Sequence, residues 1–241
     1  MEKMERLDIL LANTKNISRE RAKDLIKQGN VKINDMVTKK PSTLCQQDCK
    51  IELILPEQSY VSRGGYKLAG ALAYFCANVK DAICIDIGAS TGGFTDCLLQ
   101  HGAARVYAVD VGTKQLHPLL VSHPQVISME QVNIKNLQLD IKANFITIDV
   151  SFISLKTVLP IAYNFLYADS YCLALIKPQF EVGFEYLSKK GTPKDLMLHK
   201  KVIRDITEIT KSIGFQMIGH TPSELQGKKS KNTEYFCYLK K

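Results

Sequence analysis

The feature that most constrains the fold is an alternation, from residue 66 to the C-terminus, between segments with helical spacing and short apolar segments. Leu68, Ala71, Leu72 and Phe75 lie on one face of a predicted helix, whereas the short apolar segments predict buried strands. The strand candidates are ICIDIG (83–88), RVYAVDV (105–111), VISM (126–129), FITIDV (145–150) and YCLALI (171–176). Because parallel strands need a crossover that is usually a helix, the alternation predicts an α/β fold with a mostly parallel sheet. An amphipathic helix over residues 194–213, ended by Gly214, and two strands, FQMIGH (215–220) and EYFCYL (234–239), are expected to close the chain.

The first 60 residues predict a separate, small α+β domain. Residues 4–12 show helical spacing that places Met4, Leu7, Leu10 and Leu11 on one face, and Ser18 begins a second helix that ends near Gly29. Apolar residues alternate at 31–33 and again at 51–55, and Asn34-Asp35 suits a tight turn, so a hairpin is expected. We therefore expect one domain over residues 1–60 and a larger one over residues 61–241.

Charge and cysteine content narrow the class of protein. The 241 residues include 32 Lys and Arg against 24 Asp and Glu, and the net charge of +8 favours a polyanionic partner without saying which one. The seven cysteines lie mostly in apolar segments and form no CxxC pair, so we expect free thiols, no metal site and a cytoplasmic location. No apolar stretch approaches the roughly 20 residues that span a bilayer, and membrane insertion or secretion is not expected.

The second predicted helix and the residues before it carry a basic face that suits a phosphate backbone. Its members are Lys15, Arg19, Arg21, Lys23 and Lys27. Glu20 and Asp24 interleave with these cations, so an ordinary solvated helix is an equally good interpretation.

A glycine-rich turn predicts the cofactor site. In DIGASTGGF the glycines Gly88, Gly92 and Gly93 follow a buried strand and precede a helix, where the backbone must turn tightly and approach a ligand. Asp110 ends the next strand, where a carboxylate can accept hydrogen bonds from both hydroxyls of a ribose. Because the spacing is GxxxGG rather than GxGxxG, S-adenosylmethionine is favoured over NAD. The alternative is a plain tight turn with Asp110 as a cap.

Four polar residues without a packing role predict a catalytic centre: Lys67, Asp149, Lys177 and Glu234. Asp149 and Lys177 end predicted parallel strands, and Glu234 would reach the same edge if the last strand is antiparallel. A second lysine and a cationic sulfonium would favour the uncharged form of Lys177, which could then accept a hydroxyl proton. Taken singly, Lys67 and Glu234 are also consistent with ordinary surface charges.

In combination these segments resemble the TlyA family, RNA 2′-O-methyltransferases also labelled haemolysins. RLDILL and SRERAKDLIKQGNVKIN are similar to its S-four-type RNA-binding domain, SRGGYKL to its linker helix and DIGASTGGFTD to its cofactor loop. VSFISL, IKPQFE and NTEYF complete the resemblance. Two positions depart from it: Lys135 stands where an Arg is common after MExxN, and KSKN replaces a glycine before the Asn-x-Glu segment.

The resemblance implies a Rossmann-like, FtsJ-like methyltransferase domain in which Lys67, Asp149, Lys177 and Glu234 form a catalytic tetrad. It implies a cytidine ribose in ribosomal RNA as the substrate, and the short chain ends favour the large subunit alone. The alternative is a non-catalytic RNA-binding or membrane-perturbing protein. The implied S-adenosylmethionine residues are Gly88, Ala89, Ser90, Thr91, Gly92, Gly93, Phe94, Asp110 and Asn133, and the implied RNA-binding residues are Arg6, Arg19 and Lys40.

Overall fold

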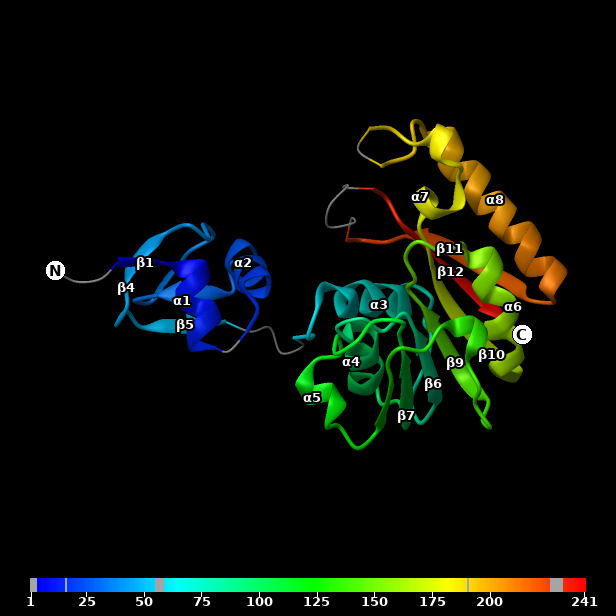
Figure 1. Cartoon of the computed structure of the whole chain (residues 1–241), viewed down its shortest axis with the longest axis horizontal. Coiled ribbons are helices and arrows are strands. Elements are labelled where there is room, and N and C mark those ends of the chain that lie inside the picture. Colours follow the sequence, from blue (N-terminus) through cyan, green and yellow to red (C-terminus); the bar gives the residue numbers. More distant parts are fainter. Residues whose placement is uncertain (1–3, 16, 55–58, 190, 226–231) are drawn as a thin grey trace. The chain divides into compact units, whose positions relative to one another are not determined.

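The structure, a computed structural model, describes residues 4–15, 17–54, 59–189, 191–225 and 232–241. Its chain forms two compact units, Met1–Ser59 and Tyr60–Lys241, which we describe one at a time (Figure 1).

The N-terminal unit combines two helices with short strands. Two strands, β1 (Met4–Arg6) and β4 (Leu44–Gln46), pair antiparallel, and β3 (Met36–Val37), β2 (Val31–Ile33) and β5 (Ile51–Leu53) form a second sheet in that order. Asn34 and Asp35 have φ values of 46° and 69°, the geometry of a tight hairpin turn, as predicted. The predicted strand end at Leu55 lies outside the described residues.

One prediction for this unit is wrong. Residues 4–6 form strand β1 rather than the first turn of a helix, and Met4 is 53% exposed instead of buried. Helix α1 (Leu7–Thr14) starts three residues later, where the amides of Leu7 and Asp8 donate to the carbonyls of Thr43 and Pro41. Pairing with a distant strand therefore overrode the local helical spacing, since tertiary context decides such short segments.

The core of the N-terminal unit confirms the remaining helical pattern. Ser18 accepts a hydrogen bond from the Arg21 amide and caps α2 (Arg19–Lys27) as the sequence predicts. Buried apolar side chains of both helices pack together with Val31 and Cys45; they are Leu7, Leu10, Leu11, Ala22, Leu25 and Ile26.

The C-terminal unit confirms the predicted α/β class. Its seven-stranded sheet has the order β11-β12-β10-β9-β6-β7-β8. The strands are β6 (Ile83–Ile87), β7 (Arg105–Val109), β8 (Val126–Met129), β9 (Ala143–Ile148), β10 (Leu166–Ile176), β11 (Gln216–Pro222) and β12 (Tyr235–Lys240). The helical segments are α3 (Arg63–Tyr74), α4 (Gly93–Gln100), α5 (Pro118–Val121), η1 (Ile134–Asn136), α6 (Leu155–Phe165), α7 (Pro178–Glu181), η2 (Phe184–Tyr186) and α8 (Leu196–Ile213).

Helices cover both faces of this sheet. Figure 1 shows α3 and α4 on one side and α6 and α8 on the other, and adjacent strand residues separate accordingly. Cys84, Phe145 and Leu173 belong to the core under α3 and α4, whereas their neighbours Ile85, Ile146 and Ala174 belong to the core under α6 and α8. Because successive strand side chains point to opposite faces, this alternation produces the three-layer arrangement.

The last strands determine which residues share an edge. Strands β8, β7, β6, β9 and β10 are parallel, whereas β12 pairs antiparallel with β10 and β11 pairs antiparallel with β12. The register Ile176↔Tyr235 places Glu234 beside Lys177 along this edge. The antiparallel last strand, on which the predicted convergence depended, is confirmed.

Candidate active site

The turn after β6 needs glycine for two reasons. Gly88 and Gly92 have φ values of 85° and 93°, in the left-handed region that disfavours other residues. A Cβ atom at Gly88 would also lie 2.5 Å from the carbonyl oxygen of Asp149. The turn and the end of β9 therefore pack backbone against backbone, and Gly92 occupies the N-cap position of α4.

A cavity of about 650 Å³, the larger cavity below, opens at the carboxyl ends of β6, β7 and β9. The predicted cofactor-binding residues that line it are Gly88, Ser90, Asp110 and Asn133. Asp110 accepts hydrogen bonds from the Ser90 amide at 2.8 Å and the Gly112 amide at 2.7 Å, so this carboxylate also holds the glycine turn. Asp110 therefore caps the turn, as in the alternative interpretation, and also lines the cavity, while its role as an acceptor for a ribose stays a prediction.

The larger cavity has the chemistry that S-adenosylmethionine requires. Each carboxylate oxygen of Asp110 keeps a further lone pair for a ribose hydroxyl. Apolar walls formed by Val132, Ile134 and Ile153 suit the faces of an adenine ring. The volume lies within the usual range for small-molecule sites.

Glu130 holds against this cavity a loop, residues 114–116, that no sequence motif marks. Its carboxylate accepts hydrogen bonds from the amides of Lys114, Gln115 and Leu116 at 2.7, 2.7 and 3.2 Å. These donors, with Leu116 contributing most, hold the pKa of Glu130 below its usual value. Gln115, which lines the larger cavity, is thereby fixed in place.

A second cavity of about 360 Å³, the smaller cavity, contains most of the predicted catalytic side chains. Lys67, Asp149, Ser151 and Lys177 line it, together with residues of the glycine turn. Gly88, Ser90, Asp149 and Ser151 line both cavities, so the two adjoin. The other predicted cofactor residues on the smaller cavity are Ala89, Thr91, Gly93 and Phe94.

The four predicted catalytic residues form two ion pairs. Lys177 Nζ lies 2.6 Å from Asp149 Oδ1 and donates a hydrogen bond to Ser151 Oγ at 3.0 Å. Lys67 Nζ donates to Glu234 Oε2 at 2.5 Å, with Glu234 nearly buried behind it. Each ammonium is thus balanced by a carboxylate, as partly buried charges require.

Local hydrogen bonds hold the segments that carry these residues. The Asn232 amide group donates to Gln179 Oε1, which joins the chain before Glu234 to helix α7, directly after Lys177. Glu181 accepts hydrogen bonds from the Ser154 hydroxyl and the Leu155 amide, and burial raises its pKa. Residues 229–231 of the KSKN segment lie outside the described residues.

Two further residues, Ser151 and Phe152, belong to the site but were not predicted from the sequence. Phe152 is 91% exposed at the wall of the larger cavity, and its ring lies 5.0 Å from that of Phe180. Its φ of 62° is unusual for a residue with a side chain. Both residues lie in the VSFISL segment, where spacing alone assigns neither a role.

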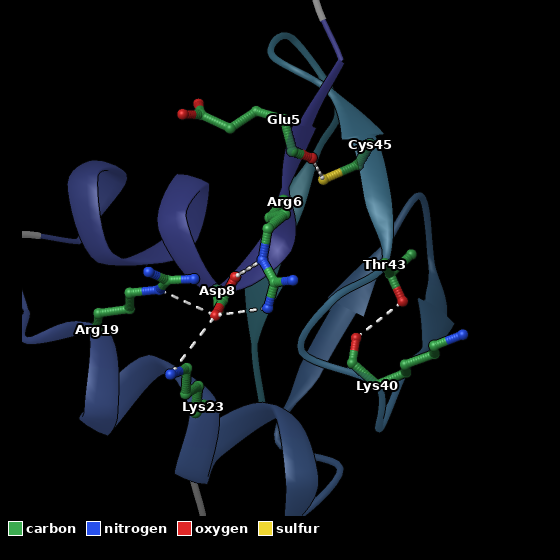
Figure 2. A network of polar contacts seen from close by, with 8 residues as sticks. All are labelled: Glu5, Arg6, Asp8, Arg19, Lys23, Lys40, Thr43 and Cys45. Atoms are coloured by element: carbon green, nitrogen blue, oxygen red, sulfur yellow. Dashed lines mark hydrogen bonds and ion pairs between the residues drawn. The ribbon is translucent and has the colours of Figure 1, made fainter.

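The predicted RNA-binding residues lie on the N-terminal unit. Arg6 and Arg19 both donate to the carboxylate of Asp8, whereas the side chain of Lys40 is exposed and points away from Asp8 (Figure 2). Among the residues that the structure describes, no group of three or more His, Cys, Asp or Glu side chains could hold a metal ion. In the same part of the chain, no helix is both long and apolar enough to cross a membrane.

Sheet order, glycine turn and paired cavities together define a Rossmann-like methyltransferase. The FtsJ-like methyltransferase family model matches residues 60–241, and the S4 domain model matches residues 5–48. The chain therefore belongs to the FtsJ-like methyltransferase family and carries an S4 domain at its N-terminal end. Membership confirms the predicted S-adenosylmethionine cofactor and the S-four-type domain.

Relatives with related names match nearly the whole chain. TlyA of Mycobacterium tuberculosis, named a 16S/23S rRNA (cytidine-2′-O)-methyltransferase, is 37% identical over 227 residues, 92% of this chain and 84% of the relative. TlyA of Campylobacter jejuni, named a 23S rRNA (cytidine-2′-O)-methyltransferase, is 33% identical over 251 residues, 97% of this chain and 98% of the relative. Hemolysin A of Brachyspira hyodysenteriae is 39% identical over 227 residues, 92% of this chain and 93% of the relative. The resemblance to the TlyA family is confirmed.

Proposed function

We propose that this chain transfers a methyl group from S-adenosylmethionine to the ribose 2′-hydroxyl of a cytidine in ribosomal RNA. The observation that carries the proposal is the junction of the two cavities. Asp149 and Ser151 line both cavities, and Lys177 contacts both of these residues. A hydroxyl in the smaller cavity would thus lie between an amine and a methyl donor in the larger one. Two relatives named as rRNA cytidine-2′-O-methyltransferases support the choice of substrate.

We assign binding of S-adenosylmethionine to the residues that the resemblance implies. They are Gly88, Ala89, Ser90, Thr91, Gly92, Gly93, Phe94, Asp110 and Asn133, most of which line one or both cavities. Bound there, the cofactor supplies an electrophilic methyl group on a sulfonium. Asp110 would accept hydrogen bonds from the ribose hydroxyls, and the glycine turn would let backbone amides approach the ligand closely.

Lys177 is the proposed general base. In its uncharged form it would accept the 2′-hydroxyl proton while the hydroxyl oxygen takes the methyl group, whose bond to sulfur breaks so that the cofactor would leave as an uncharged thioether. Asp149 and Ser151 hold the amine at the junction of the cavities, at 2.6 and 3.0 Å. Alignment of the hydroxyl with the methyl carbon contributes much of the acceleration, because orientation can remove about 7 to 11 kcal/mol from a barrier.

Lys67 and Glu234 act as the second half of the proposed tetrad. Lys67 lines the smaller cavity, and its ion pair with Glu234 fixes the direction of its side chain. A charged Lys67 at this position would hydrogen-bond the ribose or the adjacent phosphate. This division of roles gives one lysine for proton transfer and one for substrate binding.

RNA recognition is assigned to residues 1–60 and methyl transfer to residues 61–241. Arg6, Arg19 and Lys40 are the proposed phosphate contacts. We propose the large subunit alone as the substrate, in line with the name of the Campylobacter jejuni relative, a 23S rRNA (cytidine-2′-O)-methyltransferase. An rRNA substrate implies a cytoplasmic location.

The alternative is an RNA-binding or membrane-perturbing protein without catalysis, as the name of Hemolysin A suggests for that relative. It assigns no role to two lysine–carboxylate pairs beside a ligand-sized cavity. The amphipathic helix α8 buries Val202 and Ile206 in the core of the C-terminal unit, and this face is therefore not free for a lipid surface.

A methylation assay tests the proposal. The purified chain is incubated with radiolabelled S-adenosylmethionine and with isolated large and small subunits that lack the modification, and the labelled nucleotide is mapped. We expect label in large-subunit RNA, and Lys177→Ala should lower the rate by about 10² to 10⁴-fold, the usual contribution of a general base. Lys142→Ala, which removes an exposed lysine before the amino end of β9, is the matched control.

Two results would contradict the proposal. Failure to label any RNA would favour the binding-only alternative. Wild-type rates for Lys177→Ala would remove Lys177 as the base.

A further inference from the structure

The N-terminal unit contains a buried carboxylate surrounded by cations, which we call the Asp8 cluster: Asp8, Arg6, Arg19 and Lys23 (Figure 2). The Asp8 side chain is 0% exposed, whereas those of Arg6, Arg19 and Lys23 are 41%, 49% and 39% exposed. Arg6 comes from strand β1, Asp8 from α1, and Arg19 and Lys23 from α2. One carboxylate thus joins side chains from three elements.

The contacts leave the outer parts of the cations open. Arg6 donates from Nε to Oδ1 at 2.9 Å and from Nη2 to Oδ2 at 3.1 Å, and Arg19 donates from Nε to Oδ2 at 3.0 Å. Lys23 Nζ is more distant, 4.0 Å from Oδ2. Asp8 takes Nε of each guanidinium and Nη2 of Arg6, so further N–H donors of both arginines make no contact with it, and the two side chains are 41% and 49% exposed. Guanidinium donors of this kind can bind phosphate in a fork geometry.

From this geometry we infer that Asp8 is a positioning residue for RNA binding, which orients Arg6, Arg19 and Lys23 as one phosphate site. The inference rests on the proposed function, because it needs an RNA partner. Asp8 itself is too buried to touch a phosphate and has the wrong sign of charge to attract one. Its effect on RNA must therefore pass through the cations that it orders before binding.

Two physical terms act in opposite directions at this site. The negative charge of Asp8 weakens long-range attraction to a polyanion, so its removal alone should strengthen binding. Asp8 also fixes long side chains that would otherwise lose rotamer freedom on binding, and such preorganisation strengthens binding. Three cations around one carboxylate leave a net positive site, so we expect the ordering term to dominate.

The test compares two variants with the same change in net charge. Asp8→Asn removes the buried carboxylate, and Asp48→Asn removes an exposed one from the same unit. Binding of the full chain to in vitro transcribed large-subunit rRNA is measured at several salt concentrations. We expect Asp8→Asn to raise Kd about tenfold, the loss of roughly one charge-assisted contact, while Asp48→Asn binds as tightly as the wild type or more tightly.

A double variant that lacks both arginines distinguishes a positioning role of Asp8 from an effect of Asp8 on folding stability. In Arg6→Gln/Arg19→Gln, whose own affinity is lower, adding Asp8→Asn should cause little further loss, since the groups through which it acts are gone. Melting temperature and cofactor affinity are followed for every variant. If Asp8→Asn does not fold, Asp8→Glu keeps the charge but displaces the guanidinium groups, and an intermediate rise in Kd is expected.

Three results would overturn the inference. Asp8→Asn binding as tightly as Asp48→Asn would mean that ordering has no effect on RNA affinity. A tenfold loss that persists without the arginines would assign Asp8 a purely structural role. Absence of binding by the wild-type chain would remove the proposed RNA substrate itself, and with it the need for this site.

Discussion

Lys177 Nζ lies 2.6 Å from Asp149 Oδ1, although the two residues follow different strands, β10 and β9, in separate segments of the chain. The two strands are parallel neighbours, with Ala174 opposite Ile148, so the residues after them emerge at the same edge. The ion pair is therefore a direct consequence of strand order. It also lies where the two cavities adjoin, which makes it the natural place to test the chemistry.

Asp149→Asn should slow methylation with little effect on cofactor affinity. The change keeps the shape of the side chain but removes the charge that holds Lys177, and we expect a rate loss of about 10²-fold. Single-turnover methylation and cofactor titration measure the two quantities separately. Asp140→Asn, at an exposed position, is the control, and an equal loss of rate and cofactor affinity in Asp149→Asn would argue against this role.

Gly88→Ala should abolish cofactor binding. The new Cβ would combine a φ of 85° with an approach of 2.5 Å to the Asp149 carbonyl oxygen, so the turn and the end of β9 would have to separate. Gly191→Ala provides the control, because Gly191 has a φ of 72° but nothing within 4 Å of its Cβ position. It should cost about 1 to 2 kcal/mol of backbone strain and leave cofactor affinity unchanged. Calorimetric titration of both variants would decide, and tight binding by Gly88→Ala would show that the turn has more freedom than the structure indicates.

Asp86→Asn should change how stability depends on pH. Asp86 is fully buried between the hydroxyls of Thr95 and Thr147, and burial raises its pKa from 3.8 to about 6. Because the folded state binds this proton more tightly than the unfolded state does, Asp86 favours folding most below its unfolded pKa, and this contribution is lost as the pH rises through about 6.

Relative to the wild type, Asp86→Asn should therefore gain stability on the order of 3 kcal/mol between about pH 4 and about pH 7. Urea denaturation of both proteins at the two pH values measures the difference, with Asp140→Asn as an exposed control. A stability difference that stays constant with pH would contradict the raised pKa.

Phe152→Ala should weaken RNA binding without changing cofactor affinity. An aromatic ring that is 91% exposed beside the reaction site offers a surface on which a base can stack. Loss of one such contact costs about 1 to 3 kcal/mol, so Kd for the rRNA should rise by roughly tenfold or more. Tyr167→Ala, near the start of β10 and away from both cavities, is the comparison in the same binding assay. A parallel loss of cofactor affinity would indicate that Phe152 supports the pocket instead.

Periodicity and strand-end logic predicted much of the site. The strands from β6 to β12 and the helix up to Gly214 match the spacing of apolar residues, because buried faces demand that spacing. The edge shared by Asp149, Lys177 and Glu234 follows from parallel strands and one antiparallel strand. The catalytic roles of these residues stay predictions until activity is measured.

Other features have no local signal. The strand at residues 4–6 depends on a partner about 40 residues away, since Arg6 pairs with Leu44. Phe152 has a positive φ of 62° and a ring that is 91% exposed, which its residue type does not predict, and composition does not reveal that Asp8 gathers Arg6 and Arg19.

The class of fold, the glycine turn and the polar residues at the strand ends follow from the amino-acid sequence alone, because burial and backbone sterics act over a few neighbouring residues. Tertiary structure decided which charges meet: Lys177 with Asp149, Lys67 with Glu234, and Asp8 with two arginines. Ion pairing depends on distances between segments far apart in the chain, and those distances exist once the strands have paired and the helices have packed on them.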